Sequence, residues 1–228
     1  MATIADKLQL VRGRIHAAVS QFARPADSVQ LLAVSKTFPA VTVREAVAAG
    51  QHRFGENYVQ EALDKMAALS DLRDQIEWHL IGPLQSNKTR VVAEHFDWVQ
   101  SVDRLKVAQR LSEQRPAHLP PLQVCVQVNT SGEASKSGTA PEEALALARA
   151  VAALPRLRLR GVMGLPAPSE NPDEQQRQLA AVRVVFDLLC SEGLPLDTLS
   201  MGMSADLEAA IAQGSTLVRV GTALFGSR

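Results

Sequence analysis

The chain has 228 residues, 46% of them hydrophobic and 4% aromatic, and its 24 basic residues balance 24 acidic ones. That length allows a sizeable core, so residues 1–228 are expected to form a single domain. The balanced charge, without a long run of either sign, excludes a nucleic-acid or anionic-membrane footprint. No apolar run approaches the roughly 20 residues that cross a bilayer, and no signal peptide is evident. We expect a small-molecule or protein partner and a cytoplasmic monomer.

The two cysteines support the same compartment. Cys125 and Cys190 lie in apolar stretches, where a free thiol packs as a small hydrophobic side chain. Two cysteines are too few for a disulfide framework, so a reducing environment is expected.

Hydrophobic spacing alternates along the chain between helical and strand periods. An amphipathic helix is predicted from Ile4 to Phe22, behind a Thr3-x-x-Asp6 start. Strands are predicted at 29–36, 51–57, 77–82, 97–103, 122–129, 158–164, 197–202 and 216–221. Helices are predicted around Val43 and Val47, at 57–69, after Asn87, from a Thr139-x-x-Glu142 capping box to Leu154, at 179–189 and at 205–213.

This alternation of about eight strands with helices predicts an α/β fold: a single (β/α)8 TIM barrel with an extra N-terminal helix. An open doubly wound sheet is the competitor, but the G-x-G-x-x-G fingerprint that would favour it is absent from the sequence. Working residues of barrels lie at the carboxyl ends of strands. Those positions are Lys36, Glu56, Asn57, 79–82, Asp103, Asn129, Met163, 200–204 and 219–222.

One stretch resembles a nucleotide-binding loop. Residues 82–89, GPLQSNKT, match G-x-x-x-x-G-K-[ST] except that Asn87 replaces the second glycine. The match is physically poor, because Pro83 lacks an N–H and Asn87 adopts positive φ less readily than glycine. We interpret the stretch as a strand-to-helix turn capped by Asn or Ser.

A better anion site is predicted after the last two strands. Gly221 and Thr222 follow the final strand, where a helix N-terminus would present free N–H groups. Ser204, in the SMGMS segment, precedes the helix after the seventh strand and could bind the same phosphate. The alternative for Ser204 is a simple helix N-cap.

Lys36 and Arg219 suggest which phosphate-bearing compound is bound. Lys36 shares a strand face with Leu32 and Val34, so its stem starts in the interior. A partly desolvated lysine is a usable nucleophile toward a carbonyl, and pyridoxal phosphate is an aldehyde that carries a phosphate. Arg219 could donate to its pyridine nitrogen. The alternatives are a lysine that reaches solvent and an arginine in a surface ion pair.

Six blocks of the sequence carry a further resemblance and cover nearly the whole chain in order. They are AVSKTFP, FGENYVQE, WHLIGPLQSNK, the SKSG after VNTSGE, LRGVMG and LSMGMSADLEAAIAQGSTLVRVGTALFG. Jointly they resemble the pyridoxal phosphate homeostasis protein family. The resemblance implies one cofactor-binding barrel, related to the N-terminal domain of bacterial alanine racemase, with pyridoxal phosphate as an internal aldimine on Lys36.

The resemblance also implies which other residues bind the cofactor, and it implies no metal. Phosphate-binding segments fall on Ser204 and on Gly221 and Thr222, and the ring-nitrogen contact falls on Arg219. The remaining residues implied in the pocket are Asn57, His79, Ser86 and Met203. The sequence departs from the family at Phe38, where a lysine often stands two places after the aldimine lysine. Lys136 in SKSG is kept.

Catalysis is not expected. Two-base racemization needs an acid or base on each face of the cofactor, and Lys36 serves one face. Similar racemases take a tyrosine from an additional β-domain, which we do not expect here, and Tyr58, the only tyrosine, is expected on a helix outside the site. The resemblance thus implies cofactor and amino-acid homeostasis without clear turnover, with transient contacts to apo-enzymes. A pyridoxal phosphate-dependent amino-acid racemase is the alternative.

Overall fold

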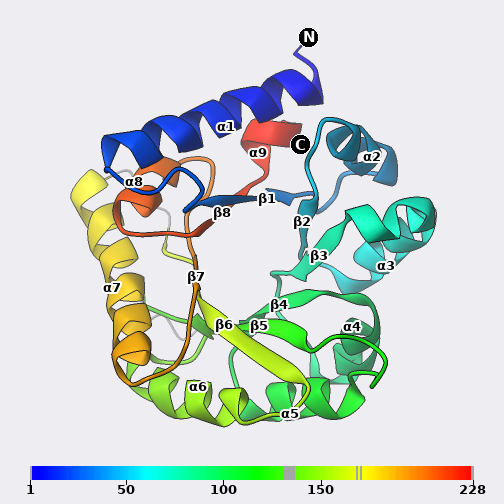
Figure 1. The fold of residues 1–228 in the computed structure, drawn as a ribbon, viewed down its shortest axis with the longest axis vertical. Helices are drawn as coiled ribbons and strands as arrows, with labels where there is room; N and C mark the ends of the chain where they lie inside the picture. Colours follow the sequence, from blue (N-terminus) through cyan, green and yellow to red (C-terminus); the bar gives the residue numbers. More distant parts are fainter. Residues whose placement is uncertain (1, 131–136, 168, 170, 227–228) are drawn as a thin grey trace.

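The computed structural model describes residues 2–130, 137–167, 169 and 171–226, and its eight strands form a closed parallel barrel in chain order. The strands are β1 (Gln30–Val34), β2 (Arg53–Glu56), β3 (Glu77–Leu80), β4 (Trp98–Val102), β5 (Leu122–Val128), β6 (Leu157–Gly164), β7 (Thr198–Ser200) and β8 (Leu217–Val220). Figure 1 shows the helices arranged around the outside of the strands. The predicted (β/α)8 TIM barrel is confirmed, and the open sheet is excluded.

The helices alternate with the strands as predicted. They are α1 (Ile4–Gln21), α2 (Ala40–Ala48), α3 (Val59–Ala68), α4 (Thr89–His95), α5 (Leu105–Gln114), α6 (Ala144–Ala152), α7 (Pro172–Ser191), α8 (Leu207–Ala212) and α9 (Thr222–Phe225), with 3₁₀ helices η1 (Ser70–Gln75), η2 (Ser86–Lys88) and η3 (Pro141–Glu143). The helix α5 was not named among the predicted helices. In the described ranges, no helix is long and apolar enough to span a membrane.

The extra N-terminal helix is α1, and it begins at a true capping box. The Asp6 N–H donates to the Thr3 hydroxyl at 3.1 Å, and the Thr3 N–H donates to the Asp6 carboxylate at 2.8 Å. These bonds satisfy backbone donors that a helix start leaves without partners. The apolar face of α1 is buried, and the helix lies against α8 and α9 (Figure 1). The predicted start and amphipathic character are therefore confirmed.

Most residues of the strands are buried. Every residue of β4 and of β8 is buried, as expected for parallel strands with helices outside and packed side chains inside. Cys125 packs inside the barrel with Trp98 and Met163, and burial raises the pKa of its thiol to about 12. Cys190 is also a free cysteine. Neither forms a disulfide, as predicted.

The predicted capping box at Thr139 is wrong. Thr139 forms an isolated bridge with Val128, and its N–H donates to the Gln127 carbonyl at 2.8 Å. Its backbone therefore extends the edge of β5 and cannot begin a helix. Ala140 is the N-cap of η3, no side chain caps it, and α6 begins only at Ala144.

Two glycines allow a matched test of the packing. A Cβ on Gly161 in β6 would overlap the carbonyl oxygen of Thr198 in β7, whereas a Cβ on Gly13 in α1 would meet no atom within 4 Å. We expect Gly161→Ala to lower the free energy of unfolding by about 1–3 kcal/mol through overpacking. Gly13→Ala should raise it by about 0.5–1 kcal/mol through helix propensity. Urea denaturation measures both, and equal midpoints would contradict the prediction.

Candidate functional site

Closure of the barrel places the last strand beside the first. Leu32 pairs with Arg219, and Ala33 pairs with Val220. The next residues, Val34 and Gly221, are therefore neighbours, and a Cβ on Gly221 would lie 3.2 Å from the Val34 carbonyl oxygen. Lys36 follows two residues later in a turn and is half-buried. The structure thus brings Lys36 and the Gly221 turn to the same end of the barrel.

Ser204 belongs to the same end. Its hydroxyl accepts a hydrogen bond from the Ala223 N–H of α9 at 3.4 Å, which ties the loop after β7 to the turn after β8. Arg14 of α1 donates to the Ser204 carbonyl at 3.1 Å and binds Glu208 through both carboxylate oxygens. Asp206 is the N-cap of α8, so the alternative in which Ser204 is that cap is wrong.

Met203 and Thr222 complete this rim. The Met203 side chain is 36% exposed, and its N–H donates to the Asp206 carboxylate. Thr222 is the first residue of α9 and is exposed. Ser204, Thr222 and Lys36 come from three different loops, so three chain segments meet where an anion was predicted.

Arg219 lies inside the barrel and is only 3% exposed, so the surface ion-pair alternative is wrong. Its guanidinium donates to the Ser200 hydroxyl and to the Gly164 carbonyl, each at 2.8 Å. Burial lowers the pKa of Arg219 to about 10, which leaves it charged at neutral pH. A guanidinium has five N–H donors, more than these two bonds use.

A hydrogen-bonded chain continues from Arg219 across the interior. The Ser200 hydroxyl donates to the side-chain oxygen Oε1 of Gln100 at 2.6 Å, and the side-chain Nε2 of Gln100 donates to His79 Nδ1 at 2.9 Å. His79 Nε2 then donates to Glu77 at 2.8 Å. The amide nitrogen of Gln100 can only donate, so His79 Nδ1 accepts and His79 Nε2 carries the proton, which fixes the His79 tautomer. Burial lowers the pKa of His79, which favours its neutral form.

His79 is therefore not brought to the rim. Its ring stacks on Trp98 at a centroid distance of 5.0 Å and reaches Arg219 only through Gln100 and Ser200. A direct contact between His79 and a ligand at the carboxyl ends stays a prediction. Gln100 and Ser200 were not predicted as residues that connect Arg219 to His79. Their signal was faint: polar residues in otherwise apolar strands.

Asn57 follows β2 and meets the loop after β3. A Cβ on Gly82 would overlap the Asn57 backbone, so glycine is required for this close approach. The Asn57 side-chain oxygen is buried, and no described residue donates to it. Such an acceptor usually has a water or ligand partner. Tyr58 is 54% exposed and directly precedes α3 instead of lying within it.

Ser86 lies in η2 and is half-buried. Its carbonyl accepts from the Thr89 hydroxyl at 2.9 Å and from Arg110 at 3.0 Å. Residues 82–89 thus form the predicted strand-to-helix turn. No side chain caps η2 or α4, so the predicted capping by Asn or Ser is wrong. Lys136 lies outside the described residues.

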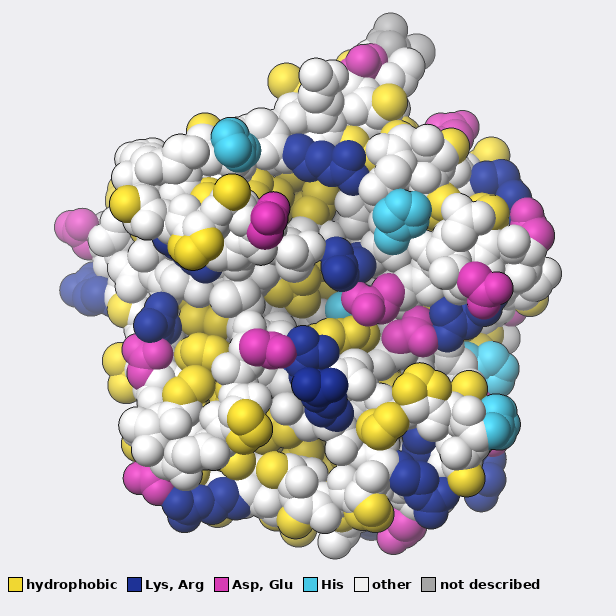
Figure 2. All heavy atoms as spheres, in the orientation of Figure 1, with side chains coloured by type: hydrophobic (Ala, Val, Ile, Leu, Met, Phe, Trp, Pro, Cys, Tyr) yellow, Lys and Arg dark blue, Asp and Glu magenta, His cyan; other side chains and the backbone are white. Residues whose placement is uncertain are grey.

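The opposite, amino-terminal end of the barrel is highly charged. Figure 2 shows acidic and basic side chains gathered around a central hollow on one face of the molecule. A hollow of about 320 Å³ lies among the amino-terminal strand ends, and His79 contributes to its lining. Arg53 pairs there with Glu77 at 3.1 Å, and Arg160 pairs with Asp197 at 2.6 Å. These charges are neutralised by one another.

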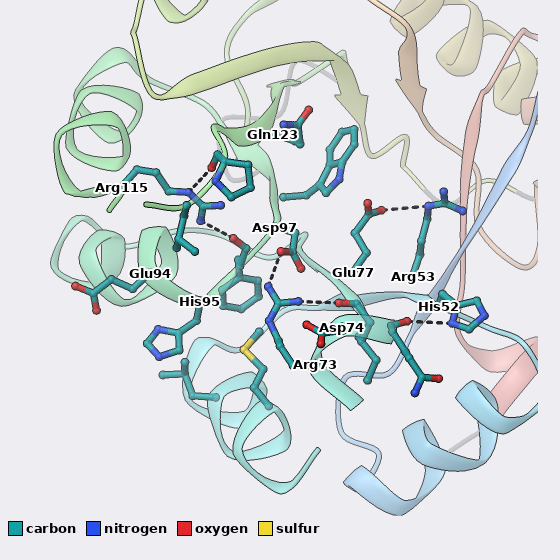
Figure 3. Close-up of a pocket in the computed structure, with 18 of the residues that line it drawn as sticks. His52, Arg53, Arg73, Asp74, Glu77, Glu94, His95, Asp97, Arg115 and Gln123 are labelled. Carbon is teal, nitrogen blue, oxygen red and sulfur yellow. Dashed lines mark hydrogen bonds and ion pairs between the residues drawn. The ribbon is translucent and has the colours of Figure 1, made fainter. Parts of the chain in front are cut away.

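A second hollow of about 1270 Å³ shares Arg53 and Glu77 with the first (Figure 3). Arg73 binds Asp97 at 2.6 Å within it, and Arg115 donates to the Phe96 carbonyl at 2.8 Å. Its lining includes none of the predicted cofactor residues. In the described part of the chain, no group of three or more His, Cys, Asp or Glu side chains is placed to hold a metal ion.

The residues at the carboxyl end suit pyridoxal phosphate. Lys36 supplies a half-buried amine, and Ser204 with the Gly221 turn supplies a hydroxyl and the start of α9 beside it. Arg219 supplies a buried cation below this rim. The unpartnered Asn57 oxygen adds an acceptor at the same end. An amine for an aldehyde and donors for a phosphate are therefore both present.

Comparisons with known proteins agree with this geometry. The family described as "Alanine racemase, N-terminal domain" matches residues 12–228. A pyridoxal phosphate homeostasis protein of Pseudomonas aeruginosa is 61% identical over 228 residues, which cover all of this chain and 97% of that protein. The structure of PipY from Synechococcus elongatus with pyridoxal phosphate bound is 40% identical, with a TM-score of 0.81 over 93% of this chain and 100% of that one.

More distant similarity concerns the fold. Alanine racemase from Corynebacterium glutamicum is 20% identical, with a TM-score of 0.67 over 95% of this chain and 61% of that one. A likeness at that identity shows a shared barrel and says nothing of chemistry. The match to the Pseudomonas aeruginosa protein spans the whole chain at 61% identity. The chain therefore belongs to the pyridoxal phosphate homeostasis protein family, with the barrel of the alanine racemase N-terminal domain.

Proposed function

We propose that this protein binds pyridoxal phosphate covalently through Lys36 and keeps it available to other proteins, as a homeostasis protein without its own turnover. The register between β1 and β8 carries the proposal, because it sets Lys36 beside the Gly221 turn and above Arg219. The relatives' names and the pyridoxal phosphate in PipY support the same ligand. We further propose that the protein acts as a cytoplasmic monomer, which its two free cysteines suit.

Each residue has a distinct part in this proposal. Pyridoxal phosphate would supply an aldehyde able to accept an amine. Lys36 provides that amine, and Ser204 with Thr222 and the start of α9 binds the phosphate. Arg219 donates toward the ring nitrogen, because its bonds to Ser200 and Gly164 hold its guanidinium below the rim. Asn57, Met203, His79 and Ser86 surround or support this set with less defined contacts.

The same residues argue against an amino-acid racemase. An arginine donor disfavours a protonated ring nitrogen and so weakens the cofactor as an electron sink. Racemization also needs a second acid or base opposite Lys36. Tyr58, the sole tyrosine, is 54% exposed and directly precedes α3. Binding and exchange need neither feature.

The first test concerns Lys36. Borohydride reduction of the protein loaded with pyridoxal phosphate should fix a pyridoxyl group on the peptide that contains Lys36. Lys36→Ala should abolish the visible absorbance of the bound cofactor, because the amine that attaches it is gone. Lys88→Ala is the matched control, since Lys88 is exposed. A label on Lys88 or Lys136 in the wild-type protein would reject the assignment.

The second test concerns the phosphate. A hydrogen bond to a charged group contributes about 1.5–3 kcal/mol, so Ser204→Ala should weaken cofactor binding about tenfold or more. Fluorescence titration measures the affinity, and Ser20→Ala on the exposed face of α1 is the control. Unchanged affinity together with a lower melting temperature would mean that Ser204 only ties the loop to α9.

The third test separates delivery from turnover. Because another amine can displace Lys36 reversibly, the loaded protein should activate an apo pyridoxal phosphate enzyme in the presence of a trap for free aldehyde. If the apo-enzyme is activated no faster than free cofactor released from the protein can account for, directed transfer is rejected. Storage of the cofactor would then be the remaining role. Exchange of amino-acid α-protons in heavy water at an enzymatic rate, lost in Lys36→Ala, would instead favour the racemase.

A further inference from the structure

The turn that carries Lys36 has an unfavourable backbone conformation. Thr37 has a φ of 68°, and among the described non-glycine residues only Ala23 shares a positive φ. A β-branched residue rarely adopts this region, and it persists there only when its surroundings impose it. Some contact must therefore hold the turn beside Lys36 in place.

Three charged side chains surround this turn from outside the barrel. Lys65 of α3 donates to the Ser35 carbonyl at 2.7 Å, to Glu56 at 2.7 Å and to Glu61 at 2.6 Å. The ammonium group thus uses all three of its donors. The cluster joins α3 to β2 and to the residue before Lys36.

The two carboxylates reach the turn themselves. Glu56 accepts from the Ser35 hydroxyl at 2.6 Å, and Glu61 accepts from the Thr37 N–H. Ser35 precedes Lys36 and Thr37 follows it, so the backbone is held on both sides of the lysine. The strained φ of Thr37 is held by the same bond to Glu61.

Burial distinguishes this cluster from an ordinary surface ion pair. The side chains of Lys65 and Glu56 are 5% and 0% exposed, and that of Glu61 is 30% exposed. Exposed ion pairs contribute little to stability, whereas the loss of one partner from a buried pair is strongly destabilising because it leaves an uncompensated charge. The spacing of Glu61 and Lys65, four residues apart on α3, would equally suit a surface pair.

We propose that Glu61 and Lys65 are positioning residues, which hold the Ser35–Thr37 turn so that the Lys36 amine meets the carbonyl of its ligand. This inference rests on the proposed function. Neither residue needs to touch the ligand, and their effect passes through the backbone on either side of Lys36. Loosening the turn should slow covalent attachment more than it weakens binding of the phosphate.

Glu61 is the residue to change, because removing Lys65 would leave the buried Glu56 without its cation. In Glu61→Ala, attachment of pyridoxal phosphate to Lys36 should slow by at least about tenfold, since small misplacements of reacting groups have effects of that order. Borohydride quenching at set times, with peptide mass spectrometry, measures the rate. Glu61→Gln keeps an acceptor for the Thr37 N–H, so most of the wild-type attachment rate should be retained in this variant.

Two comparisons separate positioning from general destabilisation. The affinity for 4′-deoxypyridoxine phosphate, which lacks the aldehyde, should change less than about twofold in Glu61→Ala, because the phosphate contacts lie elsewhere. Asp64→Ala, an exposed carboxylate on the same helix, should match the wild type in rate. The positioning role is overturned if Glu61→Ala attaches the cofactor at the wild-type rate. It is also overturned if the affinity for 4′-deoxypyridoxine phosphate falls by the same factor as the attachment rate. Absence of a Lys36 label in the wild type would instead overturn the proposed function.

Discussion

The parallel pairing of β8 with β1 is the constraint on which the site depends. It joins residues from the two ends of the chain and sets Val34 against Gly221, where a side chain would press on the backbone. A slip of one residue would turn Arg219 away from the interior and separate Lys36 from the start of α9. The close approach at Gly221 therefore helps to set the position of Lys36 relative to the turn that we propose binds the phosphate.

The burial of Arg219 is a second constraint on the site, because a buried guanidinium needs hydrogen-bond partners for its N–H donors. Ser200 and Gly164 supply them, and Gln100 and His79 extend the bonds toward Glu77 at the other mouth. The interior of this barrel is thus partly polar along one line. The bonds to Ser200 and Gly164 orient the guanidinium of Arg219. These partners come from β6 and β7, so the orientation of Arg219 could not be inferred from the sequence of β8 alone.

The sequence predicted the strands well, because period-two apolar runs and the turns between them are local signals. It also predicted that Lys36, Ser204 and Arg219 belong together, partly through family resemblance. The prediction failed at Thr139, whose Thr-x-x-Glu pattern indicates a helix cap, because its backbone bonds instead to Gln127 and Asn129 at the end of β5. No prediction was made for Glu61 and Lys65, because only the tertiary structure brings them to Thr37 and Ser35.

The rim is held largely from outside the barrel. Arg14 of α1 binds the Ser204 carbonyl, Phe38 packs on Phe225 at a ring distance of 5.2 Å, and Lys65 of α3 binds beside Lys36. At position 38, where the sequence departs from the resemblance, Phe38 thus makes an apolar contact to α9. Loops held in this way lose little entropy when a ligand binds, which favours tight retention. A protein that stores a reactive aldehyde needs to retain it through a reversible bond, such as the one proposed for Lys36. Turnover would also need a second acid or base on the face of the cofactor opposite Lys36.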